Sequence, residues 1–556
     1  MAWGRRCGRL ALAVCVPLCV LGLLEWGLRR GNAGYPTAFL VPVEIDGAPH
    51  LVNNPFYGYR FFDPRLARNP APISVAHPAP AGVIRVAVLG ESAAQGDPLL
   101  EYGLPRTLEK LLNARPDGPR HEVINAAMTA INSHVIVDIA RELAVARPDI
   151  VVLYIGNNEV IGPYGPGTVF TAWPGATALT PLRVRLTRLR TASWLRGIRA
   201  HWPGEGTPPA QWAGLAMFAN AAFAPDDPRL ERMYRRFGAN LARIIDLCQA
   251  YGARVIVSTV AVNLSDCPPF DPNAEAAHAA YREGRFAEAR DLDPLRFRAD
   301  SRINRIIRDV AGAAGTELVD AEVLFAEPGA RHFLDHVHFT MEGNWILARA
   351  IAARIAHVSP DRLPDIAETK RLLFFTPWAE RAQAALMLER RGRPPFVGQQ
   401  DNTAWMQRLA DHIHAANAEI ANTDLATVET VFQALAASDP GDVFLPLHWG
   451  GILCDAGRWA EAVPVLTGAL HRLPLHNEAR RLPAFALARS GRSAEAARLL
   501  RGQPPYGFYL AEQSIDMIRT LRRQGYPEEA RSVLRTLLDE TPHFPNRAAV
   551  VELLEE

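Results

Sequence analysis

The chain has 556 residues, 49% of them hydrophobic, so it is long enough for several domains with buried cores. Its 60 basic and 59 acidic side chains nearly cancel, which argues against a nucleic-acid-binding surface. The six cysteines lack the spacing of a disulfide framework, and no cysteine–histidine cluster has metal-ligand spacing. We therefore expect neither a metal site nor a cofactor.

The first thirty residues differ in kind from the rest. Three arginines precede an apolar run over residues 10–24, and two more arginines follow it. This pattern predicts a signal anchor over residues 1–30, a transmembrane helix that leaves the rest of the chain outside the cytoplasm, on the periplasmic side of a bacterial inner membrane. A cleaved secretory signal is the alternative, although no small-x-small cleavage site follows the run. Residues 31–82 form an extracytoplasmic lead-in on either interpretation.

Two apolar runs further along the chain end in residues suited to chemistry. Residues 83–89 predict a buried parallel strand, and Ser92 follows directly after a turn at Gly90. Residues 150–155 predict a second such strand, and Asn158 follows it. Because ligands of open α/β sheets bind beyond the carboxyl ends of the strands, we expect both side chains at one site.

A serine hydroxyl is a poor nucleophile at neutral pH and needs a base, an orienting carboxylate and donors for the developing oxyanion. Asp335 and His338 supply the carboxylate and the base, and the Asn158 amide supplies a donor. His336 is the competing base, but the Asp-x-x-His spacing favours His338. The alternative for Asn158 is a purely structural role, because turns favour asparagine.

Four segments, taken in chain order, resemble the blocks of the GDSL or SGNH hydrolase superfamily. They are Gly90-Glu91-Ser92, residues 125–130, Gly156-Asn157-Asn158-Glu159 and Asp335-His336-Val337-His338. The resemblance covers roughly residues 83–358. It implies a three-layer, flavodoxin-like α/β fold with a parallel sheet and an activity on esters or acyl groups.

The resemblance also implies a role for each matching residue. Ser92 is the expected nucleophile, His338 the base and Asp335 the residue that orients His338. The expected oxyanion hole combines the Ser92 backbone N–H, a second-block backbone N–H at Ala130 and the Asn158 side-chain amide.

Two residues depart from the family pattern. Glu91 stands where the family usually has aspartate; it keeps the charge, and we expect little effect. Ala130 stands where the family usually has glycine, and alanine resists a positive φ. If the turn needs such a φ, the oxyanion hole is expected to be strained or shifted.

We assign residues 83–360 to the hydrolase domain, with an insertion over residues 160–226 that is rich in Gly, Pro, Trp and Arg. Such insertions beyond a strand end commonly form lids or substrate walls. Its aromatic residues are expected to anchor it on the core, with pocket lining as the alternative: Tyr164, Trp173, Trp194 and Trp202. Residues 361–400 are predicted to link this domain to the next.

The carboxy-terminal part contains a repeat with a period of 34 residues. A Gly-Arg-Trp-Ala-Glu-Ala segment at Gly457 returns in related form at Gly491 and Gly525. This period resembles tetratricopeptide repeats, in which stacked helix pairs form a solenoid. Residues 401–556 are therefore predicted to be tetratricopeptide-like and to bind a protein partner.

These features predict a membrane-anchored serine esterase that deacylates a glycan, a lipid or a small metabolite through an acyl-serine intermediate. An O-acyltransferase with the same triad is the first alternative, because the group that accepts the acyl chain leaves no motif. The second is an envelope scaffold in which the repeats carry the function and Ala130 weakens catalysis.

Overall fold

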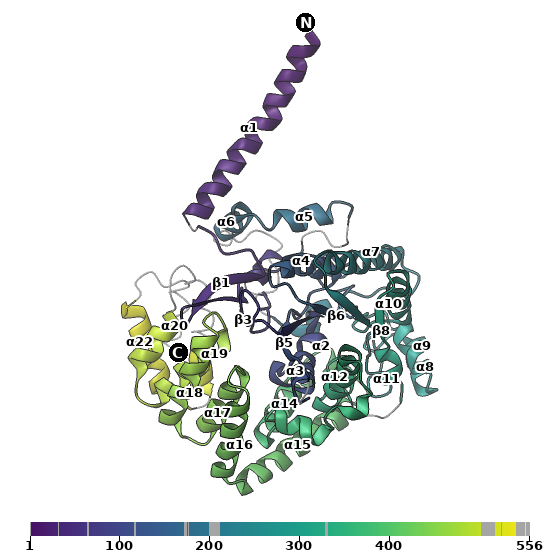
Figure 1. The fold of residues 1–556 in the computed structure, drawn as a ribbon. Helices are drawn as coiled ribbons and strands as arrows, with labels where there is room; N and C mark the ends of the chain where they lie inside the picture. The colour runs from purple at the N-terminus through teal and green to yellow at the C-terminus, as the bar shows by residue number, and fades with distance from the viewer. Residues whose placement is uncertain are drawn as a thin grey trace.

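The computed structural model shows an α/β domain, a small antiparallel sheet beside it and a succession of helices towards the C-terminus (Figure 1). The residues that the structure describes are 2–31, 33–63, 66–115, 118–171, 175, 177–199, 212–327, 332–501, 517–523, 525–540 and 551.

The α/β domain is built on five parallel strands in the order β5-β4-β6-β7-β8. The two strands first in the chain lie side by side and the later ones are added on one edge, which is the flavodoxin-like order. The prediction of an α/β domain with a parallel sheet is therefore confirmed. The strands are β4 (Val83–Gly90), β5 (Arg120–Asn125), β6 (Ile150–Tyr154), β7 (Arg254–Ser258) and β8 (Glu317–Val319).

Helices cover both faces of this sheet, which explains why the central strands are apolar on both sides. One face carries α4 (Ser133–Glu142), α7 (Pro228–Ala250) and α10 (Ser301–Ala313) (Figure 1). The other carries α3 (Leu104–Asn113) and α12 (Met341–Ala356). Three short helices complete the domain: α8 (Glu275–Arg282), α9 (Phe286–Leu292) and α11 (Ala321–Leu324).

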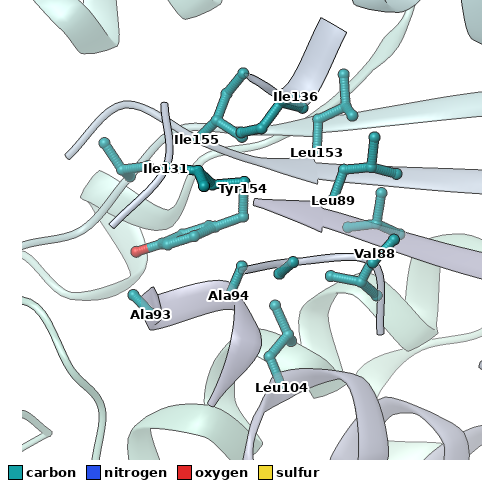
Figure 2. Packing of buried hydrophobic residues seen from close by; sticks show 14 of the residues in the cluster. Val88, Leu89, Ala93, Ala94, Leu104, Ile131, Ile136, Leu153, Tyr154 and Ile155 are labelled. Atoms are coloured by element: carbon teal, nitrogen blue, oxygen red, sulfur yellow. The ribbon is translucent and has the colours of Figure 1, made fainter. Parts of the chain in front are cut away.

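The core supports the turn that follows β4. Gly90 ends that strand, and a Cβ added there would lie 2.3 Å from the carbonyl oxygen of Tyr154 and 2.4 Å from the Cβ of Ala94. Only glycine fits so close an approach. Ala93 and Ala94 are buried in the same apolar cluster as Leu89 and Tyr154 (Figure 2). The backbone just after Gly90 is thereby packed rigidly against the sheet.

Residues of the predicted lead-in form a second, antiparallel sheet of β1 (Leu40–Ile45), β2 (Ala48–Asn53) and β3 (Ser74–Ala76). The segment between β2 and β3 carries Arg60, whose guanidinium is buried. It forms ion pairs with Asp138 at 2.7 Å and Glu142 at 3.2 Å, both on α4. The lead-in is therefore joined to the α/β domain by buried ion pairs.

The N-terminal segment is a helix, α1 (Ala2–Arg30), that projects from the body of the molecule (Figure 1). Charged residues follow the apolar part of this helix. One of them, Glu25, accepts hydrogen bonds from the backbone N–H groups of Arg190 and Thr191, each at 2.9 Å. Within the described residues, no helix combines the length and the apolar character required to cross a membrane. The prediction of an N-terminal transmembrane helix is not supported.

The predicted insertion contains α5 (Thr180–Leu186) and α6 (Arg190–Arg199), and α6 lies beside the end of α1 (Figure 1). Tyr164 is buried and lines a cavity of ≈ 270 Å³ together with His134 and Glu159, so it both anchors the insertion and lines a hollow. Trp194 is 37% exposed. Trp173 and Trp202 lie outside the described residues.

Residues 361–400, predicted to be a linker, contain two helices, α13 (Ile366–Leu372) and α14 (Pro377–Arg391). Helix α14 pairs with α15 (Asn402–Asn422). Met387 of α14 is buried in one cluster with Leu334 and Leu409. Because Leu334 immediately precedes Asp335, this helix pair packs directly on the loop that carries the predicted base.

The remaining helices turn back on one another in succession. Gly457, Gly491 and Gly525 have φ values of 74°, 76° and 83°, the left-handed conformation that lets one helix end and the next begin. This explains the 34-residue spacing of the glycines, while membership of the tetratricopeptide family stays a prediction. The helices are α16 (Leu425–Ser438), α17 (Phe444–Asp455), α18 (Trp459–Arg472), α19 (Asn477–Arg489), α20 (Ser493–Arg501) and α22 (Pro527–Glu540).

Buried ion pairs join these helices to the α/β domain. Arg106 on α3 lies 2.7 Å from Asp442, and Lys110 lies 2.6 Å from Asp442 and 2.9 Å from Asp439. Burial alone would raise the pKa of Asp442, but the two cations hold it well below its usual range. The contact between Tyr102 and His448 lies beside this cluster.

Candidate active site

A continuous line of hydrogen bonds joins three of the predicted site residues. Ser92 is the first residue of α2 (Ser92–Gln95), directly beyond β4. Its Oγ lies 2.8 Å from Nε2 of His338, and Nδ1 of His338 lies 2.7 Å from Oδ2 of Asp335. This is the arrangement in which a histidine accepts a proton from serine while a carboxylate orients the ring.

The loop around Asp335 is held by its own backbone. Oδ1 of Asp335 accepts the N–H groups of Val337 at 3.0 Å and His338 at 2.9 Å, which leaves Oδ2 to face the imidazole. Burial alone would raise the pKa of Asp335, but His338 and His336 hold it well below its usual value. The carboxylate therefore stays ionised at neutral pH and can stabilise an imidazolium.

His336, the competing base, points to a different environment. Its Nδ1 lies 3.2 Å from Oδ1 of Asp335, and its ring contacts Phe270 and Phe396. Burial lowers the pKa of His336. The structure thus places His338, and not His336, against Ser92.

Glu91 links the serine turn to the Asn158 turn. Its buried carboxylate accepts the backbone N–H groups of Gly156 at 3.3 Å, Asn157 at 2.7 Å and Asn158 at 3.2 Å. Burial and the neighbouring Glu159 raise the pKa of Glu91 well above its usual value, against the lowering effect of these three donors. Sequence reasoning gave Glu91 little importance, because the contact joins residues that are far apart in the chain.

The three predicted oxyanion donors share one property. Among the described residues, no acceptor takes a hydrogen bond from the Ser92 N–H, the Ala130 N–H or the Asn158 side-chain amide. Ser92 opens a helix, where the first N–H groups have no partner within the helix. Three donors without protein partners are what an oxyanion site requires.

Ala130 adopts a φ of 61°, in the left-handed region that favours glycine. The second-block turn therefore does need a positive φ, and alanine meets that need at a cost of about 1 kcal/mol. The sequence predicted strain at Ala130 only if this turn needs a positive φ, and the backbone angle shows that it does.

Two charged residues that sequence reasoning missed adjoin His338. Oδ2 of Asp97 lies 3.3 Å from Nε2 of His338. Arg390 of α14 approaches Asp97 Oδ2 at 2.6 Å, Asp335 Oδ2 at 3.1 Å and His338 Nδ1 at 3.2 Å. Arg390 lies in the segment predicted to be a linker, where no motif marks it.

Asp335, His336 and His338 also have donor atoms within 4.8 Å of one another, as a metal site would. However, both ring nitrogens of His338 are already engaged, Nδ1 by Asp335 and Nε2 by Ser92. This leaves His338 no free nitrogen for a metal ion, so the cluster is better suited to moving a proton.

Comparison with known proteins agrees with this geometry. Residues 88–346, less than half of the chain, match the model of the GDSL-like Lipase/Acylhydrolase family. This part of the chain is similar to the proteins of that family. The match supports an enzyme with serine esterase activity of the SGNH or GDSL type. The matched residues include Ser92, Ala130, Asn158, Asp335 and His338 but end before Arg390.

A comparison with curated proteins finds no match. Among solved structures, the chain is similar to an acetyl xylan esterase, AlAXEase, with 17% identity over 49% of this chain and 100% of that one, at a TM-score of 0.27. A lipase/acylhydrolase from Enterococcus faecalis has 15% identity over 50% and 97%, at 0.24. The acetylxylan esterase Axe2 from Geobacillus stearothermophilus has 14% identity over 50% and 95%, at 0.27.

Proposed function

We propose that this protein hydrolyses carboxylic esters through an acyl intermediate on Ser92. The observation that carries the proposal is the 2.8 Å contact between Ser92 Oγ and His338 Nε2, backed by Asp335 at 2.7 Å. A hydroxyl in this contact can lose its proton as it attacks, which a solvated serine does not do at neutral pH.

The reaction proceeds in two halves. Ser92 Oγ attacks the ester carbonyl carbon while its proton passes to His338 Nε2. The carbon–oxygen bond to the alcohol then breaks, and His338 returns the proton to the departing alkoxide oxygen. In the second half, water attacks the acyl-serine, His338 takes a proton from the water, and the proton returns to Ser92 Oγ as the acid leaves.

The negative oxygen that forms in each half needs donors. We assign this role to the N–H groups of Ser92 and Ala130 and to the Asn158 amide, none of which has a protein acceptor among the described residues. Glu91 supports them by holding the backbone of the Asn158 turn. Donors fixed before the reaction stabilise the transition state without reorganising.

We propose an ester of a glycan, a lipid or a small metabolite as the substrate. We also propose that the helices within residues 401–556 bind a protein partner, on the strength of the 34-residue repeat. An extracytoplasmic, periplasmic location belongs to the same proposal, and protease accessibility in intact and permeabilised cells tests it. If the chain resists an added protease in cells whose outer membrane alone has been permeabilised, the proposed location is wrong.

The chemistry is tested with the full chain and short-chain p-nitrophenyl esters. Ser92→Ala is expected to reduce kcat/KM by at least about a thousandfold, because the nucleophile is lost. Ser438→Ala, which removes a hydroxyl from α16 far along the chain, is the matched control and should leave the rate unchanged.

Two outcomes would contradict hydrolysis. Equal rates for wild type and Ser92→Ala would show that Ser92 is not the nucleophile. Labelling of Ser92 by a fluorophosphonate without any ester turnover would point to acyl transfer to another acceptor.

A further inference from the structure

Two carboxylates, not one, lie against the ring of His338. Asp335 faces Nδ1 at 2.7 Å, as a triad requires. Asp97 faces Nε2 at 3.3 Å, on the side where Ser92 Oγ lies at 2.8 Å. Asp97 and Ser92 thus compete for the same ring nitrogen.

A second carboxylate at Nε2 works against catalysis in the resting enzyme. A carboxylate at Nε2 can only accept an N–H from the ring, and a ring that carries a proton on Nε2 cannot accept the Ser92 proton. Another group must therefore bind the Asp97 carboxylate and balance its charge if His338 is to keep its hydrogen bond to Ser92.

Arg390 is that group. Its guanidinium lies 2.6 Å from Oδ2 of Asp97 and 3.1 Å from Oδ2 of Asp335, so one cation contacts both carboxylates. Burial alone would raise the pKa of Asp97, but Arg390 and His338 bring it below its usual value. Asp97 is thus an ionised group whose charge Arg390 balances.

The geometry points to Arg390 and Asp97 as positioning residues: Arg390 holds Asp97 so that His338 keeps its hydrogen bond to Ser92, and helix α14 completes the active site of the esterase domain. This inference rests on the proposed function. Once His338 takes the Ser92 proton, both carboxylates lie beside the imidazolium and stabilise it.

Helix α14 is held firmly enough to deliver this contact. Arg391, the next residue, is buried, with its guanidinium 4.2 Å from the ring centre of Trp405 and 5.2 Å from that of Phe396. It also donates to Asn402 at 3.0 Å. Met387, one turn earlier, packs with Leu334 beside Asp335. Arg390 therefore reaches the site from a fixed helix.

The ionisable groups near the His338 ring and its partners come from its own loop, from the turn after α2, from the segment after β7, from α14 and from the segment before α10: Asp335, His336, Asp97, Cys267, Arg390, Arg391 and Arg298. Of these groups, the variants considered next change Asp97 and Arg390 and keep the rest.

The test is the pH dependence of kcat/KM for a p-nitrophenyl ester. In Arg390→Gln, the acid limb of the kcat/KM profile should lie about one to two pH units higher than in wild type. The reason is that loss of the adjacent cation makes the His338 ring easier to protonate. Asp97→Asn should move that limb to lower pH, and the double variant should return close to wild type. Arg390→Lys should restore part of the wild-type profile, since it keeps the charge but not the planar fork.

Arg393→Gln is the matched control. Arg393 follows α14, is exposed and pairs with Glu389, so its removal should leave the acid limb in place. If Arg390→Gln lowers kcat at all pH values without moving the limb, α14 only packs against the site and the inference is wrong.

Two further readouts separate this inference from the proposed function. The rate of fluorophosphonate labelling of Ser92 against pH needs no turnover, and the ¹⁵N signals of the His338 ring against pH need no reaction. Wild type could turn over no ester while the His338 ring signals of Arg390→Gln titrate at a higher pH than those of wild type. In that case the proposed hydrolysis is wrong and the positioning role stands. Unmoved ring signals in Arg390→Gln would overturn the positioning role whatever the activity.

Discussion

The two halves of this chain contribute to one active site in different ways. The α/β half brings Ser92, Asn158 and His338 together at the ends of adjacent strands and on one loop, as its motifs predicted. The helical half contributes the Arg390 side chain, from a segment without any motif. A set of short sequence motifs therefore describes the reacting groups of the site better than it describes what balances their charges.

The largest effect is expected where the two halves meet. Asp442→Ala leaves Arg106 and Lys110 buried without their shared carboxylate, which should cost about 3–5 kcal/mol of the free energy of unfolding. Urea denaturation measures it, and Asp411→Ala, on the exposed side of α15, is the control. A change within the error of that control would mean that the two halves are joined by other contacts.

The same interface has a defined pH dependence. The folded pKa of Asp442 is depressed, so its stabilisation is fully present above the unfolded value near 4 and is lost as the pH falls through the lower, folded value. Wild type should therefore lose more stability on acidification below about pH 4 than Asp442→Ala does. Parallel losses in the two proteins would contradict the assignment.

The next effect concerns the α/β half alone. Glu91→Asp shortens the side chain by one methylene and should weaken its hold on the N–H groups of Asn157 and Asn158, lowering kcat by about ten- to a hundredfold. Glu91→Gln keeps the length without the charge and separates reach from charge. Wild-type kcat in both variants would show that the Asn158 turn is held without Glu91.

The smallest effects form a mirrored pair, one in each half. Ala130 and Gly491 both have positive φ, at 61° and 76°. Ala130→Gly should stabilise the protein by up to about 1 kcal/mol, and Gly491→Ala should destabilise it by about as much. Thermal unfolding of the two variants measures both. Changes of the same sign would show that φ is not what distinguishes these positions.

Prediction from sequence succeeded where the signal is local. A continuous apolar run followed by a glycine marks a buried strand and its sharp exit, so β4, β6 and the turn at Ser92 were readable in advance. The Asp-x-x-His spacing chose His338 over His336, and the contact with Ser92 agrees. The glycines of the 34-residue period have left-handed φ, while the tetratricopeptide-like nature of the repeat stays a prediction.

It failed where a residue acts through partners that are distant in the chain. Residues 361–400 were predicted to be a linker, yet α14 packs on the Asp335 loop through Met387. Composition records the residues of a segment but not the surface on which they pack.

The sequence by itself therefore predicted the strands and the residues whose side chains meet at Ser92, because each signal depends on neighbours within a few residues. Only the tertiary structure decided that Glu91 holds the Asn158 turn, that Ala130 bears a left-handed φ and that Arg390 balances Asp97 and Asp335. These are charges and backbone angles set by groups far apart in the chain, and electrostatic balance in a buried site depends on distance in space.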